Sequence, residues 1–307
     1  MLTDADRAAR TQSAVDAAVG AARRLGYSPG TPEVLHDLFS VVVALDPEPV
    51  VVRVPTVLPP GHDPERQRAQ QRREVAVCRW LATSGHPVVA PIFSDQPVAE
   101  GGFSMTFWTR VHTLPPPEPS PAAAGAGIAA IHTALRSCPL ELNWMQPMDD
   151  TIPAMLDALR ADPAYVSPDD RERAVREWDA LAPVLGDRAG FVSRFPRAHL
   201  QPLHGDAPAH NVLTTPTGPV DSDFEHVSHG PVEWDLTFVG PEVVSAYEDA
   251  AGHAVEPEVL ALCEAARLVQ LVAWFAMVPQ QPSLGEGMRP LLEQWRDSPP
   301  CGGVLDE

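Results

Sequence analysis

The sequence predicts an α+β fold in which a small antiparallel sheet precedes a largely helical region. Three observations support this prediction. β-branched runs bounded by turn residues occupy residues 34–54, a Pro-rich segment at 115–121 interrupts the chain, and helical apolar spacing dominates the remainder. With 307 residues and 44% apolar content, the chain can form two lobes or one large domain with a full core.

The first region is expected to contain a helix, three strands, a second helix and two further strands. Residues 11–26 are Ala-rich and end at Gly26, and residues 64–84 are amphipathic and end at Gly85, which predicts two helices. The β-branched and aromatic runs predict strands at residues 34–40, 41–45, 50–54, 88–93 and 103–108.

The second region is expected to be mainly helical. Apolar residues at helical spacing predict helices at residues 122–135, 151–160, 168–185, 232–239, 242–252 and 256–278. Two short strands, at residues 211–215 and 219–223, are expected to interrupt this series.

The composition constrains the partners and the compartment. A formal net charge of −19 argues against nucleic acid and anionic membranes, and it is compatible with a cationic ligand or simply with solubility. Four scattered Cys without a C-x-x-C pair indicate free thiols in a reducing cytosol. The N-terminus lacks a signal pattern, and the apolar stretch at 268–278 is too short to cross a bilayer. We therefore expect a cytoplasmic protein. The sequence contains no Lys, which is typical of a GC-rich, actinobacterial-type genome.

The most specific motif is His204-Gly205-Asp206, with Asn211 five residues after the Asp and Asp223 beyond a short turn. Phosphoryl transfer needs one carboxylate to orient a hydroxyl and accept its proton. It also needs an Asn amide oxygen and a second carboxylate to hold Mg²⁺ against the nucleotide phosphates. The chain has only two Asn, so coincidence is a poor explanation for this spacing.

These residues resemble the aminoglycoside phosphotransferase family, a branch of the protein-kinase-like superfamily. That family has a His-Gly-Asp-x-x-x-x-Asn loop, then an Asp-Phe-Glu or similar tripeptide, which residues 223–225 match here. The resemblance identifies Asp206 as the catalytic residue and Asn211 and Asp223 as the Mg²⁺ ligands.

The family often continues with a Trp-Asp-Leu step, which residues 234–236 match, and Asp235 is expected to hydrogen-bond the catalytic loop. Two loop positions depart from the family pattern, since Pro208 stands where His is frequent and His210 where Gly is frequent. The resemblance is strong over residues 203–236 and weaker over the rest of 33–240.

On the nucleotide side, kinases place a Lys near the end of the third strand, paired with phosphates and with a helix Glu. Without Lys, Arg53 is the candidate, and Glu74 is its natural partner. An ordinary strand Arg and a solvated Glu are the alternatives. The turn between the first two strands lacks a Gly-rich pattern. Ser40 and nearby backbone N–H groups are the candidates for covering the nucleotide phosphates. A plain hairpin without a ligand role is the alternative.

The resemblance implies a two-lobed, protein-kinase-like fold. Residues 1–107 would form the nucleotide-binding lobe, 108–114 the hinge and 115–307 the helical catalytic and substrate-binding lobe. ATP or GTP would bind between the lobes, with the base against the hinge backbone at Phe107, Trp108 and Thr109. The acceptor would be a hydroxyl of a small molecule, in particular an aminoglycoside or another cationic antibiotic, which implies a role in antibiotic resistance.

Carboxylates in the second region are candidates for binding substrate ammonium groups, and solvated helix faces are the alternative explanation for most of them. These residues are Glu141, Asp149, Asp150, Asp157, Asp169, Asp170, Glu242 and Glu248.

Several alternatives remain at this stage. Asp221 competes with Asp223 as a metal ligand, and Glu225 is either a further contact or a solvated loop residue. The acceptor could instead be a metabolite such as homoserine or choline, or the chain could be a non-catalytic nucleotide-binding relative. A metal-dependent hydrolase using His204, Asp206 and His210 is a third possibility.

Overall fold

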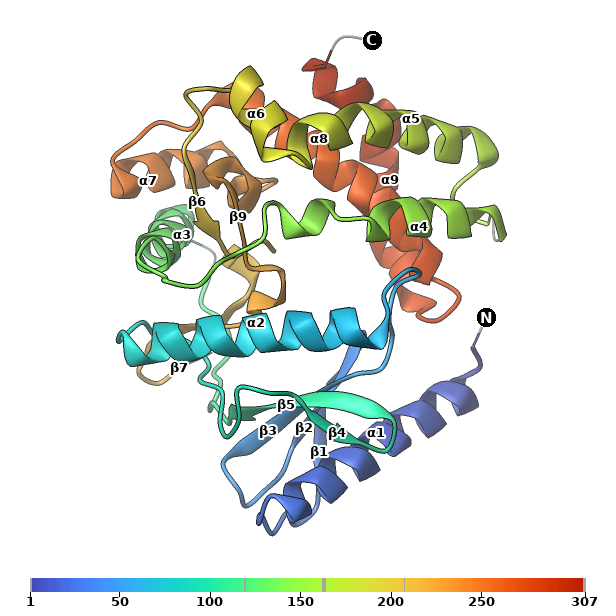
Figure 1. Cartoon of the computed structure of the whole chain (residues 1–307), viewed down its shortest axis with the longest axis vertical. Coiled ribbons are helices and arrows are strands. Elements are labelled where there is room, and N and C mark those ends of the chain that lie inside the picture. The colour runs from blue at the N-terminus through green and yellow to red at the C-terminus, as the bar shows by residue number, and fades with distance from the viewer. Residues whose placement is uncertain (1, 119, 162–163, 207, 306–307) are drawn as a thin grey trace. The chain divides into compact units, whose positions relative to one another are not determined.

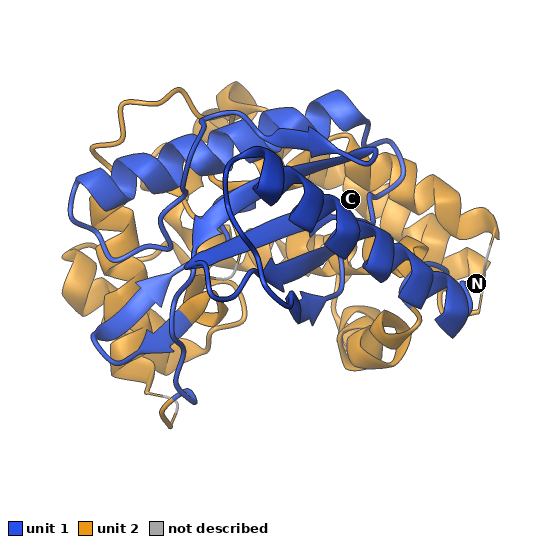
Figure 2. Cartoon of the chain, turned by 90° about the horizontal axis from the view of Figure 1, so that it is seen from below, with its two compact units in different colours: residues 1–116, 213–225, 279–281 blue, residues 117–212, 226–278, 282–307 orange. Residues whose placement is uncertain are grey.

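The computed structural model describes residues 2–118, 120–161, 164–206 and 208–305 (Figure 1). The chain forms two compact units, shown separately coloured in Figure 2. Unit 1 comprises residues 1–116, 213–225 and 279–281, and unit 2 comprises residues 117–212, 226–278 and 282–307. A five-stranded antiparallel sheet in unit 1 and a mostly helical unit 2 confirm the predicted α+β class.

Unit 1 is a sheet with one long helix on each face (Figure 1). The strand order is β1-β2-β3-β5-β4, and every neighbouring pair is antiparallel. The bounds are α1 Asp4–Arg24, β1 Glu33–Asp37, β2 Ser40–Ala44, β3 Val50–Pro55, α2 Pro64–Thr83, β4 Val98–Glu100, β5 Phe103–Thr109, β7 Val212–Thr215 and β8 Gly218–Asp221.

The core of unit 1 lies between α1 and one face of the sheet. Strand β3 alternates buried and half-buried side chains, so Val50, Val52 and Val54 enter this core while Arg53 lies on the opposite face, toward α2. The small Ala side chains of α1 allow the helix to approach the valine layer closely. Helix α1 begins seven residues earlier than predicted, because Thr3 and Asp6 form a capping box at its start.

One predicted strand is wrong. Residues 88–93 form only isolated bridges, Val88 to Asp221 and Pro91 to Trp108, and the fourth strand of the sheet is β4 instead. Pro91 has no backbone N–H to donate, so a regular ladder cannot form along this segment. The β4–β5 hairpin turns at Gly101 and Gly102, whose φ angles of 57° and 84° are the left-handed values that a tight hairpin requires.

Unit 2 is built from helices around a two-stranded sheet of β6 and β9 (Figure 1). The bounds are α3 Pro121–Leu135, η1 Gln146–Met148, α4 Thr151–Ala158, η2 Leu159–Ala161, α5 Pro168–Leu185, α6 Arg188–Arg194, β6 Leu200–Leu203, η3 Pro208–His210, β9 Ser228–Pro231, η5 Val232–Leu236, α7 Pro241–Ala251, α8 Pro257–Trp274, η6 Phe275–Met277, α9 Ser283–Asp297 and η7 Pro300–Gly303.

Most helices predicted for this region are present, with small shifts at their ends. The predicted helix at 232–239 is instead the short 3-10 helix η5, and the chain beyond it takes positive φ angles at Phe238 and Gly240. The sequence did not predict α6, β6, β9 or α9.

Helix α8 is the central helix of unit 2. Residues Pro257–Met277 are long and apolar enough to cross a membrane, but 61% of the most apolar stretch is buried inside the protein. Its buried side chains include Leu262, Val269 and Val272, so it has the character of a core helix.

Candidate functional site

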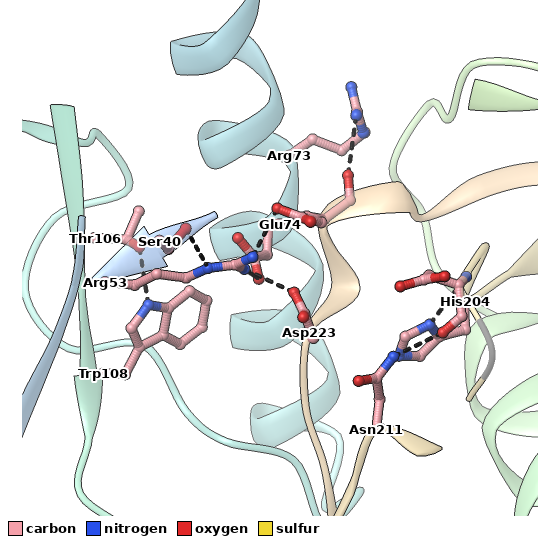
Figure 3. Close-up of polar contacts among 11 residues, drawn as sticks. Ser40, Arg53, Arg73, Glu74, Thr106, Trp108, His204, Asn211 and Asp223 are labelled. Carbon is pink, nitrogen blue, oxygen red and sulfur yellow. Dashed lines mark hydrogen bonds and ion pairs between the residues drawn. The ribbon is translucent and has the colours of Figure 1, made fainter. Parts of the chain in front are cut away.

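Arg53 lies at the centre of an ion-pair cluster in unit 1 (Figure 3). Its Nη1 atom lies 3.1 Å from Oε1 of Glu74 and 2.7 Å from Oδ1 of Asp223. Its Nη2 atom lies 2.8 Å from Oε2 of Glu225. The structure therefore brings the predicted Arg53–Glu74 pair together. It adds Asp223, singled out as a metal ligand, and Glu225, whose role the sequence left open.

In the cluster, the Arg53 guanidinium faces three carboxylates, and Arg73 adds a further positive charge that acts on Glu74. Burial alone would lower the pKa of Arg53, but the charges of Asp223, Glu225 and Glu74 outweigh burial and raise that pKa above its ordinary value. Burial raises the pKa of Glu74 to about 8, against the opposing charge of Arg53. The carboxylate oxygens of Asp223 and Glu225 are of the hard-ligand type that a divalent cation binds.

Asp221 and Asp223 have different environments. Asp223 adopts φ 65°, a left-handed conformation uncommon outside Gly, and its carboxylate faces Arg53. Asp221 is 8% exposed, and its Oδ2 lies 2.6 Å from Nε2 of His86. Its backbone N–H donates to the carbonyl of Pro87 at 2.9 Å. Asp221 therefore fixes the path of the chain, and Asp223 presents a carboxylate to the cluster.

The turn between β1 and β2 is held firmly in place. Nε of Arg53 lies 3.4 Å from Oγ of Ser40, and the carbonyl of Phe39 accepts the backbone N–H groups of Thr56 at 3.0 Å and Val57 at 3.1 Å. The side-chain amide of Gln281 also donates to the carbonyl of Leu38. Ser40 thus lies beside Arg53, as a phosphate cover would require, on a turn that lacks Gly.

The three predicted hinge residues belong to strand β5. Phe107 is in the core of unit 1, and its carbonyl accepts the N–H of Ile92 at 2.9 Å. Thr109 donates its N–H to the carbonyl of Ala90 at 2.9 Å. The indole of Trp108 donates to Oγ1 of Thr106 at 2.8 Å, on the face of the sheet that carries Arg53 (Figure 3). The chain leaves the sheet only after Thr109.

In unit 2, Asp235 anchors the loop that carries the His-Gly-Asp motif. Its Oδ2 accepts the backbone N–H of His204 at 2.8 Å, and its Oδ1 accepts that of Gly205 at 2.9 Å. Nε2 of His132 donates to Oδ2 at 3.0 Å, and Nδ1 of the same ring lies 2.8 Å from the Tyr247 hydroxyl. Asp235 is 1% exposed, so its carboxylate supports the loop as the sequence predicted.

Gly205 is required at its position for steric reasons. Its φ is 88°, and a Cβ atom there would lie 2.0 Å from the carbonyl oxygen of His226. Its own carbonyl accepts two hydrogen bonds, from Nε1 of Trp234 at 2.9 Å and from Nη2 of Arg267 at 3.0 Å. This turn directs the next residue, Asp206, away from β6.

Asn211, labelled in Figure 3, contacts the backbone of Asp206 within one loop. The side-chain amide N–H of Asn211 donates to the backbone carbonyl of Asp206 at 2.7 Å, which fixes the orientation of the Asn amide. The side chain of Asp206 is 39% exposed, and its Oδ1 lies 3.4 Å from Nη1 of Arg267. Burial tends to raise the pKa of Asp206, but the charges of Arg267, His226 and His204 bring it below its ordinary value. The carboxylate is therefore ionised and can accept a hydrogen bond from a hydroxyl.

The structure gives no support to a transition-metal site built on His204, Asp206 and His210. His204 is fully buried, and its Nδ1 accepts a long hydrogen bond, 3.4 Å, from the backbone N–H of Asp206. Within the described parts of the chain, no group of three or more His, Cys, Asp and Glu side chains is arranged to hold a metal ion.

Several of the candidate substrate carboxylates have partners within the protein. Asp157 pairs with Arg160, Asp170 with Arg296, and Glu248 accepts the N–H of Val255, while Asp149 caps the start of α4. Of the eight, five side chains are exposed: Glu141, Asp150, Asp157, Asp169 and Glu242.

A family model described as the phosphotransferase enzyme family matches residues 35–278. The chain belongs to this family. It is a nucleotide-dependent small-molecule phosphotransferase, and kinases of this family use ATP or GTP with a divalent metal ion. The search of curated proteins gave no match.

Solved structures with the same fold include several phosphotransferases of this kind. Choline kinase LicA from Streptococcus pneumoniae has a TM-score of 0.62 and 15% identity, covering 91% of this chain and 97% of its own. The GDP complex of aminoglycoside 2'-phosphotransferase-IIIa has a TM-score of 0.59 and 11% identity, covering 93% and 98%. Amicoumacin kinase hAmiN has a TM-score of 0.58 and 11% identity, covering 91% and 92%. These similarities confirm the predicted two-part, kinase-like fold.

The sequence did not identify Arg267, His132 or Tyr247 as parts of this site. For Arg267 a signal exists, because it is the sole cationic residue of α8, within a predominantly apolar helix. A charged side chain that is buried in such a helix needs a polar or charged partner, so Arg267 is expected to contact one.

Proposed function

We propose that this phosphotransferase carries out Mg²⁺-dependent transfer of the γ-phosphoryl group of ATP or GTP to a hydroxyl of a cationic small molecule. One observation carries the proposal: the Asn211 side chain donates to the backbone carbonyl of Asp206 at 2.7 Å. This bond joins the side chain of a candidate metal ligand to the backbone of the candidate catalytic residue within a single loop.

Asp206 is the catalytic residue in this proposal. Its exposed, ionised carboxylate accepts a hydrogen bond from the hydroxyl of the acceptor molecule. This bond orients the hydroxyl oxygen for in-line attack on the γ-phosphorus. Because the transition state of phosphoryl transfer is loose, the carboxylate contributes mainly positioning and takes the proton late.

Asn211 and Asp223 are the proposed metal ligands, through an amide oxygen and a carboxylate. Bound Mg²⁺ would neutralise charge that develops on the phosphates. Arg53, held by Glu74, would bind phosphate oxygens through its planar guanidinium, and Ser40 with the β1–β2 turn would cover them.

We further propose the nucleotide lobe at residues 1–107, the hinge at 108–114 and the helical lobe at 115–307. The base would lie against Phe107, Trp108 and Thr109. Because the carbonyl of Phe107 and the N–H of Thr109 already bond within unit 1, base recognition would extend to the backbone just beyond the strand.

An aminoglycoside is the acceptor class proposed first, since its ammonium groups match the acidic character of the chain. Its phosphorylation would confer antibiotic resistance. Both nucleotide donors are abundant in the cytoplasm, where we propose that the protein acts.

The test is the Asp206→Asn variant, assayed for nucleoside diphosphate release with ATP and GTP, Mg²⁺ and a panel of cationic and neutral hydroxyl compounds. We expect turnover to fall by at least about 10²-fold, the usual contribution of such a group, while nucleotide affinity measured by thermal shift stays within about threefold. Asp249→Asn, an exposed change on α7, is the control. Turnover of the Asp206→Asn variant within about tenfold of the parent would show that Asp206 is not the catalytic residue.

A further inference from the structure

The guanidinium of Arg267 is held on several sides within unit 2. Nη2 donates to the carbonyl of Gly205 at 3.0 Å, and Nη1 donates to Oε1 of Gln270 at 3.2 Å. The group lies over the ring of Trp234, 4.3 Å from its centroid. Trp234 is fully buried and donates to the same Gly205 carbonyl, so the surface beneath the guanidinium is rigid.

From this fixed position Arg267 reaches one oxygen of the proposed catalytic residue. Nη1 lies 3.4 Å from Oδ1 of Asp206. The Arg267 side chain is 11% exposed and the Asp206 side chain 39% exposed, so a fixed buried cation meets an accessible carboxylate.

Stability alone does not account for a cation at this position. Burial lowers the pKa of Arg267, although a guanidinium remains charged, and its Nε has no partner among the described residues. Replacing buried ionic groups with apolar side chains of similar size is often neutral or stabilising. The Gly205 carbonyl would keep its hydrogen bond from Trp234 without Arg267.

We propose that Arg267 is a positioning residue that holds Oδ1 of Asp206, so that Oδ2 is the oxygen that meets the acceptor hydroxyl. This inference rests on the function proposed above. In the transfer step, the bond from the acceptor oxygen to the γ-phosphorus forms as the bond from that phosphorus to the bridging oxygen breaks. The hydroxyl proton moves to Oδ2 of Asp206 and later to solvent, and the nucleoside diphosphate leaves with the bonding electron pair.

Two variants with matched chemistry test this role. Arg267→Met removes the charge and keeps an unbranched apolar side chain. The control is Arg173→Met, because the Arg173 guanidinium also lies 4.3 Å over a Trp ring, that of Trp295. Arg173 pairs with Glu177 at 2.6 Å and donates to the carbonyls of Arg296 and Ser298 at the end of α9.

The two variants should affect different quantities. For Arg267→Met we expect kcat to fall about 10²-fold, the scale of a misplaced catalytic group, with nucleotide KM within threefold and Tm within a few degrees of the parent. For Arg173→Met we expect an unchanged kcat and a lower Tm, because the buried Glu177 loses its cation. Arg267→Lys should have a kcat about tenfold higher than that of Arg267→Met. Lys restores the positive charge but lacks the planar guanidinium that donates two parallel hydrogen bonds.

The experiment uses the full chain with ATP or GTP and Mg²⁺, and measures both transfer to the acceptor panel and hydrolysis by water. If Arg267→Met keeps the parental kcat, or loses Tm and kcat in parallel as a purely structural change would, the positioning role is rejected. If the parent shows no turnover that depends on Asp206, the proposed function fails, and the role of Arg267 fails with it. A parent that is active together with an equally active Arg267→Met rejects the further inference alone.

Discussion

At the scale of single residues, the interaction partners of two carboxylates distinguish their roles, which the sequence alone does not. Asp221 and Asp223 stand two residues apart, but the first lies 2.6 Å from a His86 nitrogen and the second faces Arg53. A carboxylate held by an internal His contributes to folding. A carboxylate that faces an Arg on a left-handed backbone, as Asp223 does, is suited to binding a ligand.

We therefore expect Asp223→Ala to weaken Mg²⁺-dependent nucleotide binding by more than about tenfold, with little change in the Tm of the ligand-free protein. Asp221→Ala should lower Tm and leave metal-dependent binding within about threefold, since it removes a buried partner of His86. Calorimetric Mg²⁺ titrations in the presence of nucleotide compare the two. An equal or larger binding defect at Asp221 would reverse the assignment.

Glu233 provides a residue-scale prediction about pH. It is fully buried, its Oε1 accepts the N–H of Glu256 at 2.9 Å, and its Oε2 has no partner among the described residues. Burial raises the pKa of Glu233 to about 7 from 4.5. The folded state therefore binds a proton that the unfolded state releases between those values. Its stability falls as pH rises through that window.

Glu233→Gln should remove this pH dependence. A difference of 2.5 pK units (7 − 4.5) corresponds to an upper bound of about 3 kcal/mol. The difference in free energy of unfolding between the variant and the parent should therefore shift in favour of the variant when the pH is raised from 5 to 8. Urea unfolding midpoints at the two pH values measure the effect, with Glu242→Gln as an exposed control. Parallel pH profiles for parent and Glu233→Gln would contradict the prediction.

At the scale of elements, close contact between α3 and α7 depends on one glycine. A Cβ atom on Gly125 would lie 2.6 Å from both the backbone N of Tyr247 and the carbonyl oxygen of Val243. Gly127 lies two residues further along α3 and is exposed, with nothing within 4 Å of its Cβ position. The same substitution should therefore have opposite effects at the two positions.

Gly125→Ala should force α7 away from α3 and cost about 1–3 kcal/mol, as overpacked cores do. Gly127→Ala should stabilise the helix by about 0.5–1 kcal/mol, since Ala has the higher helix propensity. Thermal unfolding of both variants tests the pair. If both raise Tm, or both lower it equally, the close approach of the helices is not what requires Gly125.

Element-scale prediction from sequence succeeded where one local signal dominates. Capping residues and apolar spacing place α5 at Pro168–Leu185, the range that the sequence predicts. It failed at residues 88–93, where β-branched composition suggests a strand but Pro91 prevents a regular ladder. Strand β6 contains Pro202 and β9 contains Gly230, residues with low strand propensity, so only their mutual pairing reveals them.

At the scale of the whole molecule, some residues of the candidate site carry a local sequence signal, and others are revealed only by the tertiary structure. Asp206 and Asn211 were found because the motif is contiguous, and Arg53 because Lys is absent and few basic residues remain near that strand. Arg267 lies 61 residues from Asp206. The sequence marks Arg267 as the sole cationic residue of α8, but its contact with the loop requires the tertiary structure.

The last prediction belongs to the molecule as a whole. A chain with a net charge of −19 attracts cations over its surface, and five of the eight candidate substrate carboxylates in unit 2 are exposed. Exposed ion pairs contribute modestly and are screened over a Debye length of about 8 Å at physiological ionic strength. For a cationic acceptor, KM should therefore rise steadily with added KCl, and more than KM for the nucleotide.

A neutral hydroxyl compound from the same panel is the matched control, and its KM should not depend on salt because it gains nothing from the acidic field. The comparison separates two effects of salt. Screening of the protein's electrostatic field would change KM for the cationic acceptor only, whereas an effect of salt on the catalytic loop would alter kcat for both acceptors alike. If only neutral or anionic compounds are phosphorylated, with KM independent of KCl, the acceptor is not a cation. The net charge would then serve solubility, and the reaction would be that of a metabolite kinase.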